Sequence, residues 1–308
     1  MKKTLVALAV LAASGASFAQ VTITGQYGFG YAQSSDSANA TAGGLGISDS
    51  NISFVDVEDL GGGLKVTSQL KIDGLNRAKA AGGDTFVSIA GGFGTVTLGL
   101  AEFDTDTADQ FGTFLGATIL GGHIGDSERT ADFAQYATSF GPVGLSVRHT
   151  EADKGLGAGA AGSSAQRENT IALSYAAGPL SVKADYSAFD NKAGTNYDTR
   201  TTLGGNYDLG AVKFGLGIQT TKFYTTGSTT ETFLGASIPL GALAIGIDYM
   251  STKFADTATD GTGTGFGIQA KYNLSKRTDI RARYTNYDAS INPANKSTGT
   301  SVVVEHFF

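Results

Sequence analysis

Acidic side chains gather in one segment of the chain that lacks the alternating pattern found on either side of it. The segment covers residues 101–130 and follows a short alternating stretch at residues 95–100. A segment of this length without regular structure is uncommon inside an ordered domain unless it has a function. Its first acidic residues are Glu102, Asp104, Asp106 and Asp109. Carboxylates facing basic groups across a narrow aqueous passage create a transverse field that orients dipolar solutes and favours one sign of ion.

Charged residues also recur on one face of several segments that alternate between polar and apolar positions. Their neighbours on the opposite face are apolar, as expected of β-strands with two different environments. Charges facing hydrocarbon are costly, so the charged face is expected to line water. Together with the four acidic residues above, these side chains form the predicted pore constriction: Lys71, Arg148, Lys183, Asp185, Asp248, Arg281 and Arg283.

Period-two alternation starts at Val21 and recurs in sixteen segments, the last of which is residues 300–308. Sixteen is an even number, as is typical of bacterial outer-membrane barrels. A soluble β-sandwich has the same alternation within a single strand, so the choice between the two depends on further features.

Two such features favour a membrane barrel. Short Gly- and Pro-containing turns, such as residues 91–94 and 177–179, take turns with longer polar loops, which is the pattern of periplasmic turns and external loops. Aromatic residues also fall near both ends of the strands, where they would form two interfacial belts. The sequence therefore predicts an all-β fold: a 16-stranded antiparallel transmembrane β-barrel with an inward-folded third external loop at residues 101–130. The aromatic residues are Tyr31, Tyr136, Tyr175, Tyr186, Tyr207, Tyr249, Tyr272, Tyr284 and Phe308.

Two predicted strands carry residues that fit this scheme poorly. Asp56 falls on the face that Ile52 and Phe54 assign to lipid, and Phe133 points inward if Tyr136 points outward. A contact between subunits would shelter Asp56 from hydrocarbon, and a β-bulge in either strand is the alternative explanation.

The first nineteen residues are expected to be a cleaved signal peptide, leaving residues 20–308 as the barrel domain. Lys2 and Lys3 precede an apolar run at residues 5–13, and Ser17 and Ala19 fit a cleavage site. Removing these two lysines from the 22 basic residues leaves 20 against 28 acidic ones, a net charge of −8. This charge argues against nucleic acid as a partner.

The composition gives little support for catalysis or for metal binding. The chain has no cysteine and three histidines, and no close spacing of metal-ligating residues. No nucleophile elbow or phosphate-binding loop is present. We therefore expect no catalytic site, no cofactor and no metal.

Several stretches resemble the general (non-specific) trimeric porins of Gram-negative outer membranes. They are residues 58–65 (EDLGGGLK), residues 91–99 (GGFGTVTLG), residues 274–279 (LSKRTD) with residues 282–284 (ARY), and the final Phe308. The resemblance covers essentially the whole mature chain. It implies a water-filled passive diffusion channel for small hydrophilic solutes and ions, located in the cell outer membrane. It also implies a homotrimer in contact with outer-membrane lipid and lipopolysaccharide, and a barrel-assembly machinery that recognises Phe308.

Two departures from the family pattern affect the expected ion selectivity. Porins of this kind often carry Arg in the second strand, where this chain has Asn51, and often end the fifth strand with Gly-Arg, where this chain has Gly99 and Leu100. Anion preference is therefore not implied, and the negative net charge favours a weak cation preference.

Three alternative functions remain open from the sequence alone. A solute-specific channel would differ from a general one only in selectivity. A membrane-barrel enzyme would need a Ser, a His and an orienting group clustered at one interface. The nearest approach to that is His306 beside Glu305, whose side chains alternate to opposite faces. An adhesin or structural anchor would not need the long third loop or the charged lumen.

Overall fold

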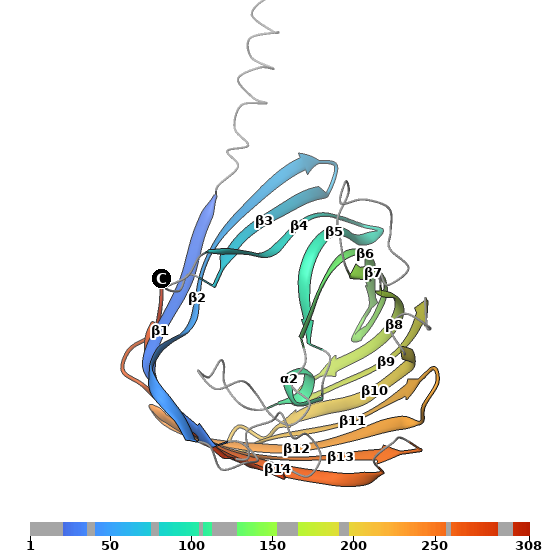
Figure 1. Ribbon diagram of the computed structural model, residues 1–308. Coiled ribbons are helices and arrows are strands. Elements are labelled where there is room, and N and C mark those ends of the chain that lie inside the picture. The colour runs from blue at the N-terminus through green and yellow to red at the C-terminus, as the bar shows by residue number, and fades with distance from the viewer. Residues whose placement is uncertain are drawn as a thin grey trace, which may run out of the picture.

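The chain folds into a single closed antiparallel β-barrel, shown in Figure 1. The computed structural model describes residues 21–35, 41–74, 80–104, 107–112, 128–152, 166–190, 197–256, 260–288 and 298–308. Each strand pairs with its neighbours in sequence, and the first strand pairs with the last to close the sheet. The predicted 16-stranded barrel is confirmed. The predicted signal peptide at residues 1–19 lies outside the described residues.

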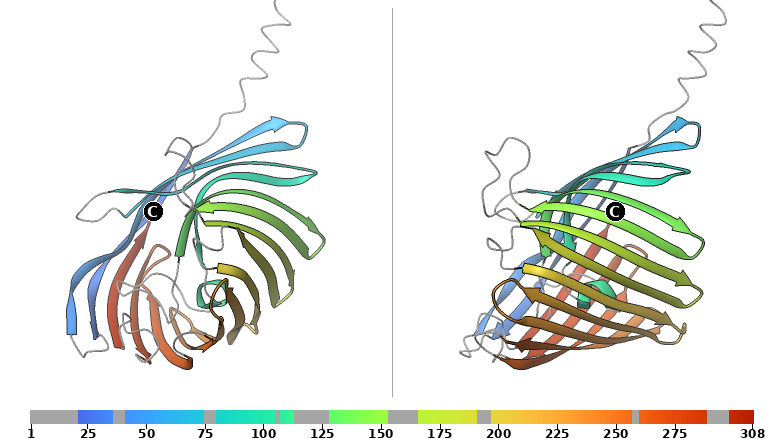
Figure 2. Two further views of the ribbon diagram at one scale, coloured as in Figure 1. Left: turned by 45° about the vertical axis from the view of Figure 1, so that its right-hand side comes forward. Right: turned by 90° about the vertical axis from the view of Figure 1, so that its right-hand side faces the viewer.

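The strands are inclined to the barrel axis, as Figure 2 shows. They are β1 (Thr22–Ser35), β2 (Thr41–Gly61), β3 (Leu64–Asp73), β4 (Ala81–Gly91), β5 (Gly94–Asp104), β6 (Glu128–Phe140), β7 (Val143–Ala152), β8 (Gln166–Ala177), β9 (Leu180–Asp190), β10 (Tyr197–Asp208), β11 (Lys213–Phe223), β12 (Ser228–Leu240), β13 (Leu243–Ala255), β14 (Gly261–Asn273), β15 (Thr278–Tyr287) and β16 (Thr298–Phe307). One helix, α2 (Thr107–Phe111), lies among the described residues.

The two faces of the sheet differ as the alternation predicts. Large apolar side chains such as Leu98 and Leu216 are more than half exposed on the outer face. All nine aromatic residues assigned to the two belts are also exposed there. The buried polar side chains, among them Thr202 and Gln219, face the lumen. An apolar exterior with a polar interior is the arrangement of a membrane barrel that encloses water.

The two poorly fitting strands adopt the faces that the alternation assigns to them. Asp56 shares the outer face with Phe54, which pairs with the exposed Leu70. The Asp56 Oδ1 atom is buried without a hydrogen-bond partner among the described residues. Phe133 faces the lumen, where its ring meets that of Phe103 edge-on at 5.4 Å. The register shifts of β2 lie opposite Tyr27 to Phe29 of β1 and between Asp59 and Gly61, so a bulge does not explain Asp56.

The third loop is shorter than residues 101–130, because its two ends are strand. Residues 101–104 of β5 pair with residues 128–131 of β6, beginning with Ala101 opposite Ala131. The prediction that this whole segment lacks strand structure is therefore wrong at both ends. Residues 101–104 (AEFD) alternate between apolar and acidic, so the alternation of β5 continues through them. The helix α2 lies inside the barrel beside β10, β11 and β12, as Figure 1 shows.

Within the described residues, no helix has the length and the apolar character needed to cross a bilayer.

The barrel closes where the last residue meets the first strand. The backbone N–H of Gly25 donates to the carbonyl of Phe308 (3.1 Å), and that of Phe308 donates to the carbonyl of Gly25 (3.0 Å). A Cβ atom on Gly25 would lie 2.4 Å from Cζ of Phe308 and 2.5 Å from the backbone oxygen of Asn51. Glycine is therefore required for the two chain ends to approach this closely.

We expect Gly25→Ala to destabilise the closed barrel. The added methyl group overpacks the closing contact, which costs about 1–3 kcal/mol of unfolding free energy. The change in unfolding free energy is measured by urea unfolding in detergent, with the gel mobility of the unheated protein as the readout. Gly44→Ala is the matched control, since a Cβ there would meet no atom within 4 Å. Equal stability of the two variants would contradict the steric role of Gly25.

Candidate functional site

A group of charged side chains lies on the lumenal face of five neighbouring strands, β6 to β10. Adjacent strands bring them together, because residues that pair across the sheet point to the same face. Arg148 of β7 pairs with Thr170 of β8, which in turn pairs with Ser187 of β9. We call this group the lumenal charge cluster: Arg129, Arg148, Glu168, Lys183, Asp185 and Arg200.

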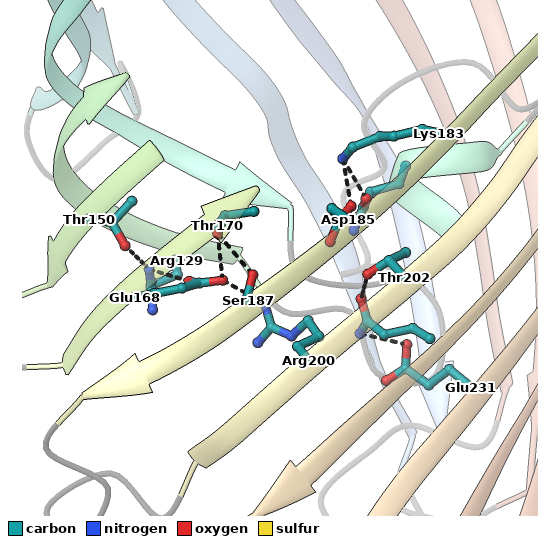
Figure 3. A network of polar contacts seen from close by, with 12 residues as sticks. Arg129, Thr150, Glu168, Thr170, Lys183, Asp185, Ser187, Arg200, Thr202 and Glu231 are labelled. Carbon is teal, nitrogen blue, oxygen red and sulfur yellow. Dashed lines mark hydrogen bonds and ion pairs between the residues drawn. The ribbon is translucent and has the colours of Figure 1, made fainter. Parts of the chain in front are cut away.

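Glu168 is the centre of the cluster and is only 3% exposed. Its Oε2 atom lies 2.6 Å from Nη2 of Arg129, and its Oε1 atom lies 3.8 Å from Nη1 of Arg200. Figure 3 shows Glu168 between these two arginines. The hydroxyl of Thr170 donates to the same carboxylate (3.3 Å) and contacts the hydroxyl of Ser187 at 2.8 Å. One buried carboxylate therefore holds two arginines on the wall.

Arg148 has a different environment from the other two arginines. Its guanidinium lies 4.1 Å from the centroid of the Phe103 ring, a cation–π contact. Among the described residues, no carboxylate lies within ion-pair distance of Arg148, and its buried Nε atom has no hydrogen-bond partner. Its positive charge is thus less compensated than that of Arg129.

The cluster borders a recess of about 340 Å³ whose lining includes Arg148, Glu168 and Arg200. Lys183 connects this recess to the third loop. Its Nζ atom donates to Oε1 of Gln110 in α2 (2.9 Å) and lies 3.2 Å from Oδ2 of Asp185. The cluster contains four basic and two acidic side chains, so this part of the wall is positive.

The remaining predicted wall residues lie on the lumenal face but apart from the lumenal charge cluster, and two of them form ion pairs of their own. Arg281 contacts Asp279 through two hydrogen bonds of 2.7 and 3.1 Å, and Lys71 lies 2.6 Å from Asp73. Asp248 is buried on β13, and Arg283 faces the lumen two residues beyond Arg281. The structure thus brings Arg148, Lys183 and Asp185 together and places Lys71, Asp248, Arg281 and Arg283 elsewhere on the wall.

Of the four predicted loop acids, Glu102 is the one whose side chain the structure describes. It is exposed at the edge of the recess, and its backbone N–H donates to Oδ1 of Asp84 (2.8 Å). Asp104 belongs to β5 and Asp109 to α2, but their side chains lie outside the described residues, as does all of Asp106. That these acids face the basic wall stays a prediction.

Sequence reasoning missed Glu168 and Arg200 and gave Arg129 no role on the wall. Alternation alone identifies Arg200 as lumenal, because Leu203 and Tyr207 on the same strand face outward. Glu168 lies near the beginning of β8, before the alternating apolar residues Ile171 and Leu173. Its contact with Arg129 depends on the register of β6, β7 and β8, which no pattern within one strand reveals.

Among the described side chains, no group of three or more His, Asp or Glu residues is placed to hold a metal ion.

We expect Glu168→Gln to destabilise the barrel far more than a matched change at an exposed ion pair. Removing one partner of a buried ion pair leaves the other charge uncompensated, which costs about 3 kcal/mol or more. Glu151→Gln is the control, because Glu151 pairs with Arg167 at 3.2 Å on the outer face and is 53% exposed. An exposed pair contributes about 1 kcal/mol or less. Urea unfolding of both variants tests this, and equal losses would show that Glu168 does not organise the cluster.

Comparison with known proteins agrees with this architecture. A family model described as a Gram-negative porin matches residues 4–292. The outer membrane porin protein 32 of Delftia acidovorans is 32% identical over 253 residues, which cover 72% of this chain and 70% of that protein.

Two solved structures share the fold. An anion-selective porin from Comamonas acidovorans superposes with a TM-score of 0.71 at 23% identity, covering 94% of this chain and 100% of that one. The in-vitro folded trimer form of OmpT from Vibrio cholerae gives a TM-score of 0.69 at 14% identity, covering 94% and 99%. The family model spans nearly the whole chain, and a curated outer-membrane relative supports it. The chain therefore belongs to the Gram-negative porin family and forms a channel across the outer membrane.

Proposed function

We propose that this porin is a passive diffusion channel for small hydrophilic solutes and ions, which move down their own gradients. The observation that carries the proposal is the lumenal charge cluster, a set of ionised side chains on the inner wall of a closed sixteen-stranded barrel. Charges in such numbers are inexpensive only where water reaches them. Because Arg148 lines the recess and has no ion-pair partner among the described residues, solutes are expected to pass beside it.

We further propose that the lumenal charge cluster attracts anions. Its basic residues outnumber its acidic ones, and fixed charges in a narrow passage raise the local concentration of the opposite ion. One structural neighbour is described as an anion-selective porin, which agrees with this direction. The sequence predicts a weak cation preference from the negative net charge and the two missing arginines, so this proposal takes the opposite direction.

The proposed assembly is a homotrimer. One structural neighbour is described as a trimer form, and a carboxylate at Asp56 on an outer face needs shelter from hydrocarbon. The other proposed partners are outer-membrane lipid and lipopolysaccharide around the exposed apolar face, and a barrel-assembly machinery that recognises Phe308.

The contacts of His306 and Glu305 give no support to the enzyme alternative. Nδ1 of His306 lies 2.9 Å from the hydroxyl of Thr278, and its ring packs against Tyr27 on the outer face. Glu305 accepts a hydrogen bond from Ser48 on the lumenal face. The two side chains thus point away from each other. We therefore propose a channel without a catalytic role.

Planar-bilayer recording of the detergent-purified protein tests the proposed function. An open diffusion pore gives conductance steps of fixed size, and a trimer gives them in groups of three. If labelled protein is found in the membrane but no conductance is recorded, the proposal is overturned.

We expect Arg148→Gln to shift the zero-current potential toward cation selectivity. Removing the positive charge lowers the local anion concentration. Under a tenfold KCl gradient the expected shift is about 5–15 mV. Arg167→Gln is the control, because Arg167 lies on the outer face of β8 and pairs there with Glu151. A shift of equal size in both variants, or none in Arg148→Gln, would remove Arg148 from the ion path.

A further inference from the structure

An apolar cluster lies inside the barrel, on a wall whose buried side chains are mostly polar. Its members on the strands are Phe233 of β12, Met250 of β13 and Tyr287 of β15, all less than 10% exposed. Apolar side chains on the wall of a water-filled passage would remain hydrated unless another element covered them. Here the cover is α2, which contributes Ala108 and Phe111, with exposed fractions of 4% and 2%.

The three strand residues of this cluster belong to one continuous row of paired residues that crosses six strands. Each residue of the row pairs directly with the next one, from β10 to β15, so all of them share the lumenal face. Two glycines start the row, and they are direct partners on adjacent strands. The row is Gly204, Gly217, Phe233, Met250, Gly265 and Tyr287.

The glycine pair leaves a notch that the Phe111 ring fills. A Cβ on Gly217 would lie 2.5 Å from Cδ2 and 3.2 Å from Cε2 of Phe111, and 3.2 Å from Cβ of Thr107. All three of these nearest atoms belong to α2. A Cβ on Gly204 would lie 2.6 Å from the same ring, and also 2.5 Å from the backbone oxygen of Leu216. No other residue type fits at Gly217 without displacing α2.

We propose that Phe111 is the positioning residue of the constriction loop, and that its docking into the notch formed by Gly204 and Gly217 sets the open cross-section of the pore. The inference rests on the proposed channel function. The ring and Ala108 hold α2 against β10, β11 and β12, where Figure 1 shows it. The hydrogen bond from Lys183 to Gln110 orients the same helix toward the lumenal charge cluster. The contact of Phe111 with the two glycines holds α2 against the wall, and the hydrogen bond from Lys183 sets which side of α2 faces the passage.

A thiol probe tests the docking without relying on conduction. The chain has no cysteine, so Ala108→Cys introduces a single thiol at a buried position of α2. A water-soluble maleimide should label it slowly in the trimer. Adding Gly217→Ala or Phe111→Ala should speed labelling about tenfold or more, because the helix then leaves the wall. Adding Gly44→Ala should leave the rate unchanged, since a Cβ at Gly44 meets no atom within 4 Å.

Single-channel conductance tests the consequence for the pore. Gly217→Ala and Phe111→Ala, each without the cysteine, should raise the single-channel conductance by about 1.3-fold or more. The double variant should conduct no more than either single variant, because both substitutions remove the same contact. Labelling at the control rate in both variants would overturn the docking. Fast labelling with unchanged conductance would overturn its role in setting the cross-section. Absence of conductance in the unmodified protein would instead overturn the proposed function, while the labelling result would still decide the docking.

Discussion

Closure of the sheet is the constraint on which the rest of this structure depends. A bilayer interior offers no water, so every backbone N–H and C=O in it must bond within the protein. Pairing of β1 with β16 removes the last free edge. Once the sheet is closed, alternation divides every strand between lipid and lumen, and the position of each charge follows from its parity along the strand.

A closed wall also limits what can narrow the passage. The side chains of the strands stay close to the wall, so a separate element must enter the interior to narrow it. The helix α2 does this, and an apolar cluster holds it against the wall. Next to it, Glu168 organises Arg129 and Arg200, whereas Arg148 stacks on Phe103. Anchoring and charge are therefore supplied by different residues on neighbouring strands.

Features that repeat within a strand could be predicted from the sequence, and features that depend on register between strands could not. Alternation correctly assigned Arg148, Lys183 and Asp185 to the lumen and Tyr186 to the exterior. It also predicted the unusual outer position of Asp56. It did not reveal that Gly204 and Gly217 are partners or that Glu168 meets Arg129. Each of these depends on which residues of distant segments pair, and that is fixed by closure of the whole barrel.

Cysteine scanning along β9 tests the central claim, that one face of each strand lines water and the other faces lipid. Four variants of the otherwise cysteine-free chain each carry one cysteine, in place of Lys183, Ala184, Asp185 or Tyr186. Each variant is reconstituted into membranes and treated with a charged thiol reagent that does not enter lipid. The account predicts rapid reaction at positions 183 and 185 and little at positions 184 and 186. Equal reaction at all four positions, or the opposite pattern, would contradict a water-filled lumen on the assigned face.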